Sequence, residues 1–150
     1  MTAAVPSIVD RPGSPQNWEG VVEHDEAVHM LRSIAAAFDR HDLDAILTHF
    51  ADDAVFEAPR GPDAWGQRVS GKASIREAFA GRFSGIPDVR YQDDDHFVDG
   101  DRGASEWTLS GTSSAGQRIE VRGCDLWTFR DGKVLKKDSF WKIRTTDEPT

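Results

Sequence analysis

RGCDLWTFRDGKVLKKDSFW, residues 122–141, is the stretch of sequence that decides the fold. Within it, Asp131-Gly132 separates two runs rich in aromatic and β-branched residues, which is the strongest short-range signal of a β-hairpin. Because side chains alternate between the two faces of a strand, Asp125, Trp127 and Phe129 share one face, and the two rings mark that face as buried. The sequence therefore predicts a carboxylate that points into an apolar environment, where it needs hydrogen-bond partners or an altered pKa.

Two registers of this hairpin place different residues opposite Asp125. A plain two-residue turn pairs Asp125 with Asp138, so that the two Cβ atoms lie about 4.5–5.5 Å apart and the carboxyl groups share a proton. A bulge in the second strand instead turns Ser139 and Trp141 inward and sends Asp138 outward. Asp138 is therefore a second candidate catalytic residue, and the residues alone leave both registers open.

The composition is that of one globular domain. Of the 150 residues, 38% are hydrophobic, with five Trp and eight Phe, which is enough for a proper core. A net charge of −8 and a pI of about 5.0 oppose nonspecific binding to nucleic acid or to an anionic membrane. The lone Cys124 forms no intramolecular disulfide. The first residues lack the regions of a signal peptide, and no apolar run approaches the roughly 18 residues of a membrane span, so a soluble, cytoplasmic protein is expected.

Along the chain, the pattern predicts a flexible arm over residues 1–22, one domain over residues 23–144 and a polar tail over residues 145–150. Apolar stripes at helical spacing predict three helices, the first from Asp25 to Phe38, the second over 43–50 after the cap Asp42, and the third from Ser70-Gly71 to 85–87. Residues 54–58 are predicted as a short strand, 60–63 as a loop, and 91–144 as almost continuous strand. Helices followed by an antiparallel meander give an α+β order, in which three helices cover one face of a curved sheet and enclose a cone with a pocket at its mouth.

Four segments together resemble the NTF2-like superfamily: HDLDAI from His41, FADDAVFEAP from Phe50, GKASIR from Gly71 and DLWTFRDGKV from Asp125. Within the superfamily, the sequence is most similar to SnoaL-like polyketide cyclases and ketosteroid isomerases, over residues 25–141. The resemblance implies an NTF2-like cone with a mixed, mostly antiparallel sheet, a deep apolar pocket and a homodimer formed through the outer face of the sheet. It does not fix the reaction, because this superfamily includes isomerases, cyclases, dehydratases, epoxide hydrolases and noncatalytic binders.

The functional residues of these relatives carry over only in part. The resemblance aligns Asp125 with the protonated oxyanion Asp of ketosteroid isomerase, whereas the isomerase base falls at Ala58. It also matches Gly123-Cys124-Asp125 to the general-base segment of the cyclases, whose accompanying His falls at Ser113. In limonene-epoxide-hydrolase-like members an Asp of the last strand falls at Ser139, which favours the bulged register.

The residues and the resemblance together suggest a cofactor-independent enzyme in which Asp125 transfers a proton next to a carbonyl of a hydrophobic small molecule. The expected pocket residues are Phe56, Trp65, Phe79, Trp107, Trp127, Ser139 and Trp141. Trp65 is either a lid over the pocket or a cover for the edge of the core. The rival expectation is a noncatalytic binding or dimeric interaction domain, since the isomerase base and the cyclase His are missing. A third expectation is an enzyme that opens an epoxide with water, which requires Asp138 to face inward.

The histidines are not predicted to form a site. His24 and His29 are five residues apart, a spacing that does not place them on the same face of a helix, and the sequence contains no His-Glu-x-x-His motif. The segment from Asp93 to His96 is interpreted as a solvated acidic loop. No Gly-rich phosphate-binding loop and no convincing Ser-His-Asp order occurs, so neither a metal nor a nucleotide cofactor is implied.

Overall fold

The computed structural model describes residues 17–145, which form one α+β unit. Three helices and six strands follow in the order α1 (Asn17–Asp39), α2 (Leu43–Leu47), β1 (Phe50–Asp63), β2 (Gly66–Ser70), α3 (Lys72–Gly85), β3 (Arg90–Asp99), β4 (Arg102–Thr112), β5 (Arg118–Arg130) and β6 (Lys133–Trp141). The predicted class and its three helices are confirmed. The first helix begins at Asn17 rather than at the predicted Asp25, so residues 17–22 of the predicted arm belong to α1. The rest of the predicted arm and residues 146–150 lie outside the described residues.

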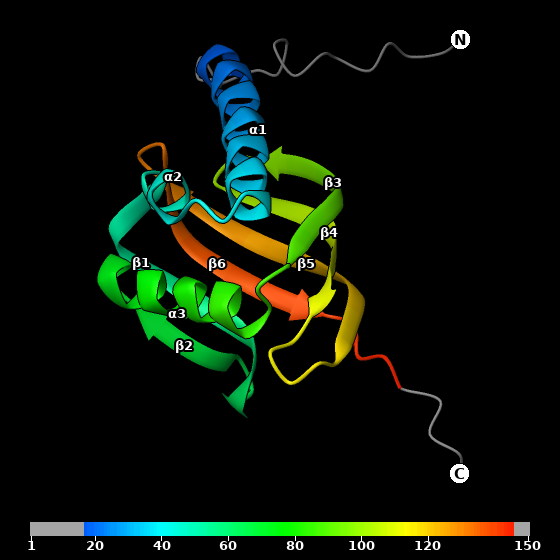
Figure 1. The fold of residues 1–150 in the computed structure, drawn as a ribbon. Coiled ribbons are helices and arrows are strands. Elements are labelled where there is room, and N and C mark those ends of the chain that lie inside the picture. Colours follow the sequence, from blue (N-terminus) through cyan, green and yellow to red (C-terminus); the bar gives the residue numbers. More distant parts are fainter. Residues whose placement is uncertain (1–16, 146–150) are drawn as a thin grey trace, which may run out of the picture.

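The six strands form one sheet in the order β2-β1-β6-β5-β4-β3. Only β1 and β6 run parallel, so the sheet is mixed and mostly antiparallel, as predicted. All three helices lie against the same face of this curved sheet, with α1 along β3 and α3 across β1 and β2 (Figure 1). We call the face covered by helices the inner face and the opposite face the outer face. Within the described chain, none of the helices is long and apolar enough to span a membrane.

The first hairpin differs from the prediction. Residues 60–63, predicted as a loop because of their Gly and Pro, belong to the 14-residue strand β1, which pairs with β2 through an irregular register. Gly61 permits this pairing, since a Cβ atom at this position would lie 2.2 Å from the carbonyl carbon of Gly66. The backbones of the two strands therefore approach more closely than a residue with a side chain would allow.

The hairpin of β5 and β6 has the predicted turn and the bulged register. Asp131 and Gly132 have φ angles of 52° and 71°, the two positive values that a type I′ turn requires. Phe129 pairs with Val134 but Thr128 pairs with Lys136, so Leu135 is one extra residue in β6. Beyond this bulge Asp125 pairs with Ser139, and the alternative pairing of Asp125 with Asp138 is wrong.

A second bulge lies in β3 and was not predicted. Gln92 pairs with Thr108, whereas Asp95 pairs with Glu106, so β3 gains one residue near Asp93, whose φ angle is 55°. As a result His96, rather than Asp95, pairs with Ser105. Each bulge reverses which residues of its strand face inward.

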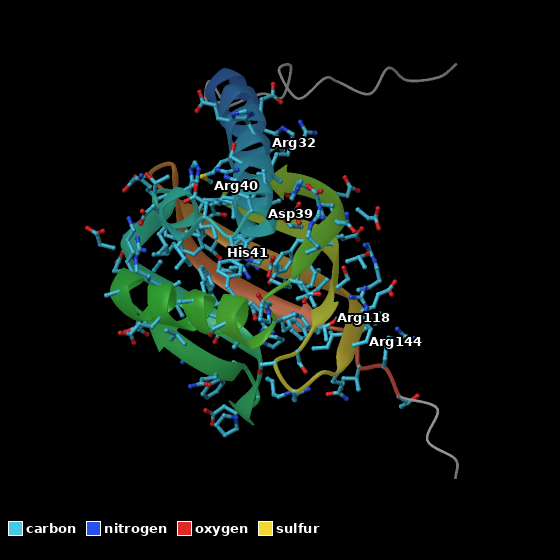
Figure 2. The ribbon with its side chains drawn as sticks, in the orientation of Figure 1. Arg32, Asp39, Arg40, His41, Arg118 and Arg144 are labelled. Atoms are coloured by element: carbon cyan, nitrogen blue, oxygen red, sulfur yellow. The ribbon has the colours of Figure 1, made fainter. Side chains whose placement is uncertain are left out.

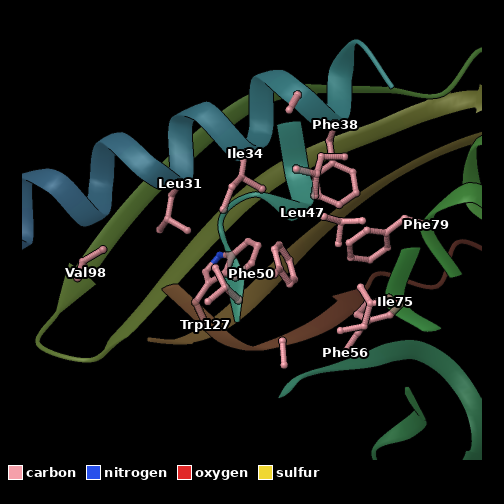
Figure 3. Packing of buried hydrophobic residues seen from close by; sticks show 14 residues of the cluster. Leu31, Ile34, Phe38, Leu47, Phe50, Phe56, Ile75, Phe79, Val98 and Trp127 are labelled. Carbon is pink, nitrogen blue, oxygen red and sulfur yellow. The ribbon is translucent and has the colours of Figure 1, made fainter. Parts of the chain in front are cut away.

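The hydrophobic core fills the space between the helices and the inner face (Figure 3). Phe79 of α3 lies at its centre, with ring centroids 5.0 Å from Phe38, 5.0 Å from Phe56 and 5.8 Å from Phe50 in edge-to-face geometry. Such aromatic pairs add to the stabilisation from burial alone. The core thereby fixes α1, α3 and β1 around the inner face.

The end of α1 is tied to the start of β3 by polar contacts. Asp39 accepts hydrogen bonds from the Arg90 guanidinium at 2.7 and 3.0 Å and from the backbone N–H of Tyr91 at 3.0 Å. His41 follows α1, whose last residue is Asp39 (Figure 2). The His41 ring stacks on Phe83, and its Nε2 lies 2.7 Å from the Val89 carbonyl oxygen. These contacts hold Tyr91 in place beside the polar residues of the inner face.

Candidate functional site

A row of four polar side chains crosses the inner face from β6 to β3. Ser139 pairs with Asp125, Asp125 with Ser105, and Ser105 with His96 in the register of the sheet. We call these four residues the polar row. Ser139 and Asp125 are 5% exposed and Ser105 is 2% exposed, and the His96 side chain is 3% exposed. Polar groups buried to this degree need partners, and each of the four has at least one.

Asp125 is surrounded by three hydrogen-bond donors. Its Oδ2 accepts from Trp107 Nε1 at 2.8 Å, and its Oδ1 accepts from Lys137 Nζ at 2.9 Å and from Ser139 Oγ at 2.5 Å. Ser139 Oγ in turn accepts from Lys137 Nζ at 2.7 Å. The predicted buried carboxylate is thus present, and its main partner is a buried ammonium group.

Lys137 brings this ammonium group into an aromatic environment. Its Nζ lies 4.9 Å from the centroid of Phe56, 5.3 Å from Phe38, 5.6 Å from Phe79 and 5.8 Å from Trp127. Rings at such distances attract a cation through their negative faces. Burial nevertheless lowers the pKa of Lys137, while the negative charge of Asp125 acts in the opposite direction.

The other end of the polar row is a chain of hydrogen bonds that leads to the surface. Trp127 Nε1 donates to Ser105 Oγ at 2.9 Å, and Ser105 Oγ lies 2.7 Å from His96 Nδ1. His96 Nε2 lies 2.6 Å from Asp94 Oδ2, and the Asp94 side chain is 39% exposed. Two titratable groups, one on each side of Ser105, therefore occupy the same row.

A small cavity of about 30 Å³ lies between the polar row and α1. Its apolar wall consists of Leu31, Ile34, Ala35 and Phe38. Its remaining lining consists of Tyr91, Asp94, His96, Ser105, Trp107, Asp125, Trp127 and Lys137. Burial raises the pKa of Tyr91, so this hydroxyl stays protonated. The cavity has room for about two water molecules, so within the part of the chain that the structure describes it is smaller than the deep apolar pocket that was expected.

Some predicted pocket residues lie in or directly beneath this cavity. Trp107 and Trp127 line it, and each donates its indole N–H to a residue of the polar row. Ser139 belongs to the row and contacts both Asp125 and Lys137. Phe56 and Phe79 do not line the cavity; they lie in the core beneath the Lys137 ammonium.

The other predicted residues lie elsewhere. Asp138 lies on the outer face opposite Glu57, so its predicted place in the pocket is wrong. Burial and the negative charge of Glu57 raise the pKa of Asp138 there. Trp65 is 45% exposed and stacks on Arg68 at 4.5 Å near the end of the β1–β2 hairpin, away from the cavity. Trp141 packs behind Trp107, with ring centroids 6.4 Å apart, and does not line the cavity.

Lys137, His96 and Asp94 belong to the site but were not predicted. Lys137 was within reach, because the alternation that turns Ser139 and Trp141 inward in the bulged register also turns Lys137 inward. His96 had no such signal, since its orientation depends on the unpredicted bulge near Asp93. The interpretation of this segment as solvated is wrong for the His96 side chain, which is buried. Ser105, His96 and Asp94 form a Ser-His-Asp arrangement in space, which the order of these residues in the sequence did not indicate.

Comparisons with known proteins agree with this architecture. Solved structures with similar folds include a protein proposed to be a polyketide cyclase from Xanthomonas campestris pv. campestris, with a TM-score of 0.72 and 20% identity over 80% of this chain and 93% of that chain. A protein proposed to be an isomerase from Bacillus subtilis has a TM-score of 0.68 and 21% identity, over 80% of this chain and 88% of that chain. A protein with a ketosteroid isomerase-like fold from Catenulispora acidiphila, in complex with trimethylamine, has a TM-score of 0.66 and 19% identity, over 76% of this chain and 85% of that chain.

At these identities the structural likeness establishes the NTF2-like fold and not the reaction. No curated protein sequence matches this chain significantly. A family model for the SnoaL-like domain matches residues 31–136, which contain α2, α3, the whole polar row except Ser139, and most of the sheet. The resemblance inferred from the sequence is confirmed, and the chain belongs to the SnoaL-like domain family.

Proposed function

We propose that this protein is an enzyme that transfers a proton to or from a hydrophobic small molecule without a cofactor, with Asp125 and Lys137 as its acid–base pair. The observation that carries the proposal is the buried ion pair of these two residues, 2.9 Å apart, at the lining of the cavity. A charged pair is costly to bury, so a pair that faces a cavity beneath an apolar wall is a candidate for chemistry rather than for stability.

The two residues of the pair have complementary roles in the proposed reaction. Lys137 has three N–H donors and uses two of them on Asp125 and Ser139, so the third is available to a carbonyl oxygen of the ligand. Negative charge that develops on this oxygen during removal of a neighbouring proton is stabilised by the ammonium group in a site of low polarity. Asp125 Oδ2 accepts one hydrogen bond, from Trp107, so its second lone pair is the proposed acceptor of the carbon-bound proton.

Several convergent polar groups favour catalysis over passive binding. A binding pocket needs few polar groups, which fix the orientation of the ligand. Here the lining brings together Asp125, Lys137, His96 and Ser105. The small volume of the cavity requires the α1 wall to move when an organic ligand enters, and closure over the ligand would exclude water from the pair.

The alternative is a noncatalytic binding domain. Its support is the saturation of the buried polar groups, since every buried side-chain N or O atom in the described residues has a hydrogen-bond partner. Water addition to an epoxide is not favoured, because it requires Asp138 on the inner face, and this residue lies on the outer face opposite Glu57.

Exchange of carbon-bound protons in D₂O tests the proposed function. The intact protein is incubated with a panel of hydrophobic, enolisable ketones, and NMR measures deuterium at the carbon next to the carbonyl. We expect exchange that depends on the wild-type protein, that is lost in Asp125→Asn and Lys137→Met, and that is retained in Asp138→Asn and Lys136→Met. The two control residues lie on β6, the strand of Lys137, but on the outer face. Equal exchange by Asp125→Asn, folded by circular dichroism, would refute the assignment, and binding of a ketone without exchange would favour the noncatalytic alternative.

The proposal includes the homodimer and the cytoplasmic location expected from the sequence. Phe97 and Phe140 are 55% and 48% exposed, and both belong to the outer face, where their cross-strand partners are Ala104 and Cys124. Light scattering of the purified protein gives its mass in solution, and a monomer at micromolar concentration would remove the dimer from the proposal.

A further inference from the structure

His96 occupies a position in the site that the proposed Asp125–Lys137 reaction does not use. It ends the polar row on β3, two pairings away from Asp125, and it lines the same cavity. The bulge near Asp93 gives it this position, since an unbroken β3 would direct Asp95 inward instead. A buried histidine with a partner at each ring nitrogen is a defined hydrogen-bonding unit, whose proton positions follow from its partners.

The hydrogen bonds of this unit have one direction when His96 is neutral. The Asp94 carboxylate can only accept, so the proton of a neutral ring lies on Nε2 and is donated to Asp94 at 2.6 Å. His96 Nδ1 is then the acceptor of the Ser105 hydroxyl proton at 2.7 Å, and Ser105 Oγ in turn accepts the indole N–H of Trp127. In this arrangement Ser105 presents a hydroxyl, polarised by His96, to the cavity.

We propose that His96, held by Asp94 and reaching the cavity through Ser105, is the second acid–base group of this site. In this scheme Ser105 accepts a proton from a ligand atom as its own hydroxyl proton passes to His96 Nδ1. His96 becomes an imidazolium ion paired with Asp94, and the reverse transfer returns the proton to a ligand atom and restores the neutral ring. No protein bond other than O–H and N–H bonds breaks or forms, and no electron leaves the site.

This inference rests on the proposed function and narrows its reaction class. Asp125 and Lys137 lie on one side of Ser105, and His96 and Asp94 lie on the other. When the Asp125 carboxylate removes a proton, the His96 imidazolium ion delivers one through Ser105, and in the opposite direction neutral His96 removes the proton and protonated Asp125 delivers one. Exchange of one proton with water at each group then restores the starting state. A site of this kind suits the shift of a proton between two atoms of the same ligand, as in an isomerisation. A single acid–base pair must instead perform both transfers by itself.

Two indole signals make the arrangement testable by NMR on the intact protein. Trp127 Nε1–H reports on Ser105 and His96, whereas Trp107 Nε1–H reports on Asp125 and Lys137. Nitrogen spectra of the histidine side chains identify the protonated ring atom directly. We expect the neutral His96 ring to carry its proton on Nε2, and His96→Gln to shift the Trp127 signal more than the Trp107 signal. His24→Gln is the matched control, because His24 also lies beside an aspartate, Asp25 at 3.3 Å, but on the exposed surface of α1.

The exchange assay then tests the role in catalysis. His96→Gln is expected to lower the rate of proton transfer roughly 100-fold or more, the usual contribution of a general acid or base. Asp94 acts through His96 and is a positioning residue: Asp94→Asn keeps an acceptor for Nε2–H, so it should retain the tautomer while lowering the rate. A proton on Nδ1 of the wild-type ring, or an unchanged exchange rate in His96→Gln, would overturn the inference.

The two proposals fail in different ways. If the wild type exchanges no ketone, the proposed function fails, while the tautomer and the Trp127 signal still decide the hydrogen-bond arrangement around His96. If Asp125→Asn loses exchange and His96→Gln does not, the proposed function stands and His96 is a structural residue.

Discussion

Lys137 Nζ lies 2.9 Å from Asp125 Oδ1, although the strand register sets Lys137 opposite Trp127 rather than opposite Asp125. The lysine therefore reaches diagonally across the β5–β6 hairpin and carries its charge to the carboxylate between four aromatic rings. The Lys137 and Asp125 side chains are only 9% and 7% exposed. If one charge were removed, water could therefore not solvate the remaining charge well.

The first prediction concerns the stability contributed by this pair. Asp125→Asn and Lys137→Met should each lower the free energy of unfolding by about 3–5 kcal/mol, because each leaves one buried charge without its partner. The double variant should lose less than the sum of the two, since it leaves no uncompensated charge. Urea denaturation of the four proteins measures the coupling. Strictly additive losses would show that the two side chains do not interact in solution.

The second prediction concerns Gly123, which lies opposite Trp107 on β4. A Cβ atom at Gly123 would lie 2.4 Å from the Trp107 ring and 2.7 Å from the Phe140 carbonyl oxygen. Gly123→Ala should therefore destabilise the protein by about 1–3 kcal/mol, through displacement of the ring. The displaced indole should also lose its hydrogen bond to Asp125, which the Trp107 Nε1–H signal in an NMR spectrum reports. An unchanged signal in a stable variant would contradict the contact.

The third prediction separates two aromatic residues that were both expected in the pocket. Phe79 is 2% exposed at the centre of the core, so Phe79→Ala should lower the free energy of unfolding by about 3–5 kcal/mol. Trp65 is 45% exposed and contacts Arg68, so Trp65→Ala should change stability by less than about 1 kcal/mol and leave ketone exchange unaffected. Chemical denaturation and the exchange assay together check both expectations. Loss of exchange in Trp65→Ala would place this residue back at the site.

The fourth prediction is a pH dependence that originates at the end of α1. Hydrogen bonds from the Arg90 guanidinium hold the pKa of Asp39 below its usual value. The stabilisation from this carboxylate is therefore complete above the unfolded-state pKa of about 3.9 and is lost as the pH falls through the lower, folded-state value. Asp39→Asn should cost about 1–2 kcal/mol near neutral pH and progressively less in acid. Thermal unfolding of both proteins from neutral pH to about pH 2 measures the difference, and a constant difference would refute the assignment.

The regular parts of the fold were predictable because their signals are local. The turn at Asp131-Gly132 follows from two residues that tolerate positive φ, and the burial of Asp125 follows from the alternation with Trp127. The cap of α2 was also predicted, and Asp42 accepts a hydrogen bond from the backbone N–H of Ala45 at 3.1 Å.

The unpredicted parts depend on contacts between distant segments. The inward position of His96 requires an extra residue in β3, which is determined by the pairing with β4 and not by the local sequence. Residues 60–63 continue strand β1, with Asp63 paired with Gly66 of β2, although their Gly and Pro content favours a loop. The partner of Asp125 was open between two registers, and the bulge at Leu135 decides in favour of Ser139, with Lys137 beside it.

The bulge at Leu135 also makes the chemistry of β6 sensitive to the pairing of this single residue. If Leu135 were instead paired with Thr128 in a regular ladder, Lys136 and Asp138 would take the positions opposite Trp127 and Asp125 that Lys137 and Ser139 now hold. The inner face would then present two acidic groups side by side, the arrangement that water addition to an epoxide requires. The pairing of one residue thus separates two arrangements of the inner face on one scaffold, and a pairwise alignment whose gap is misplaced by one position would assign the wrong chemistry to a relative.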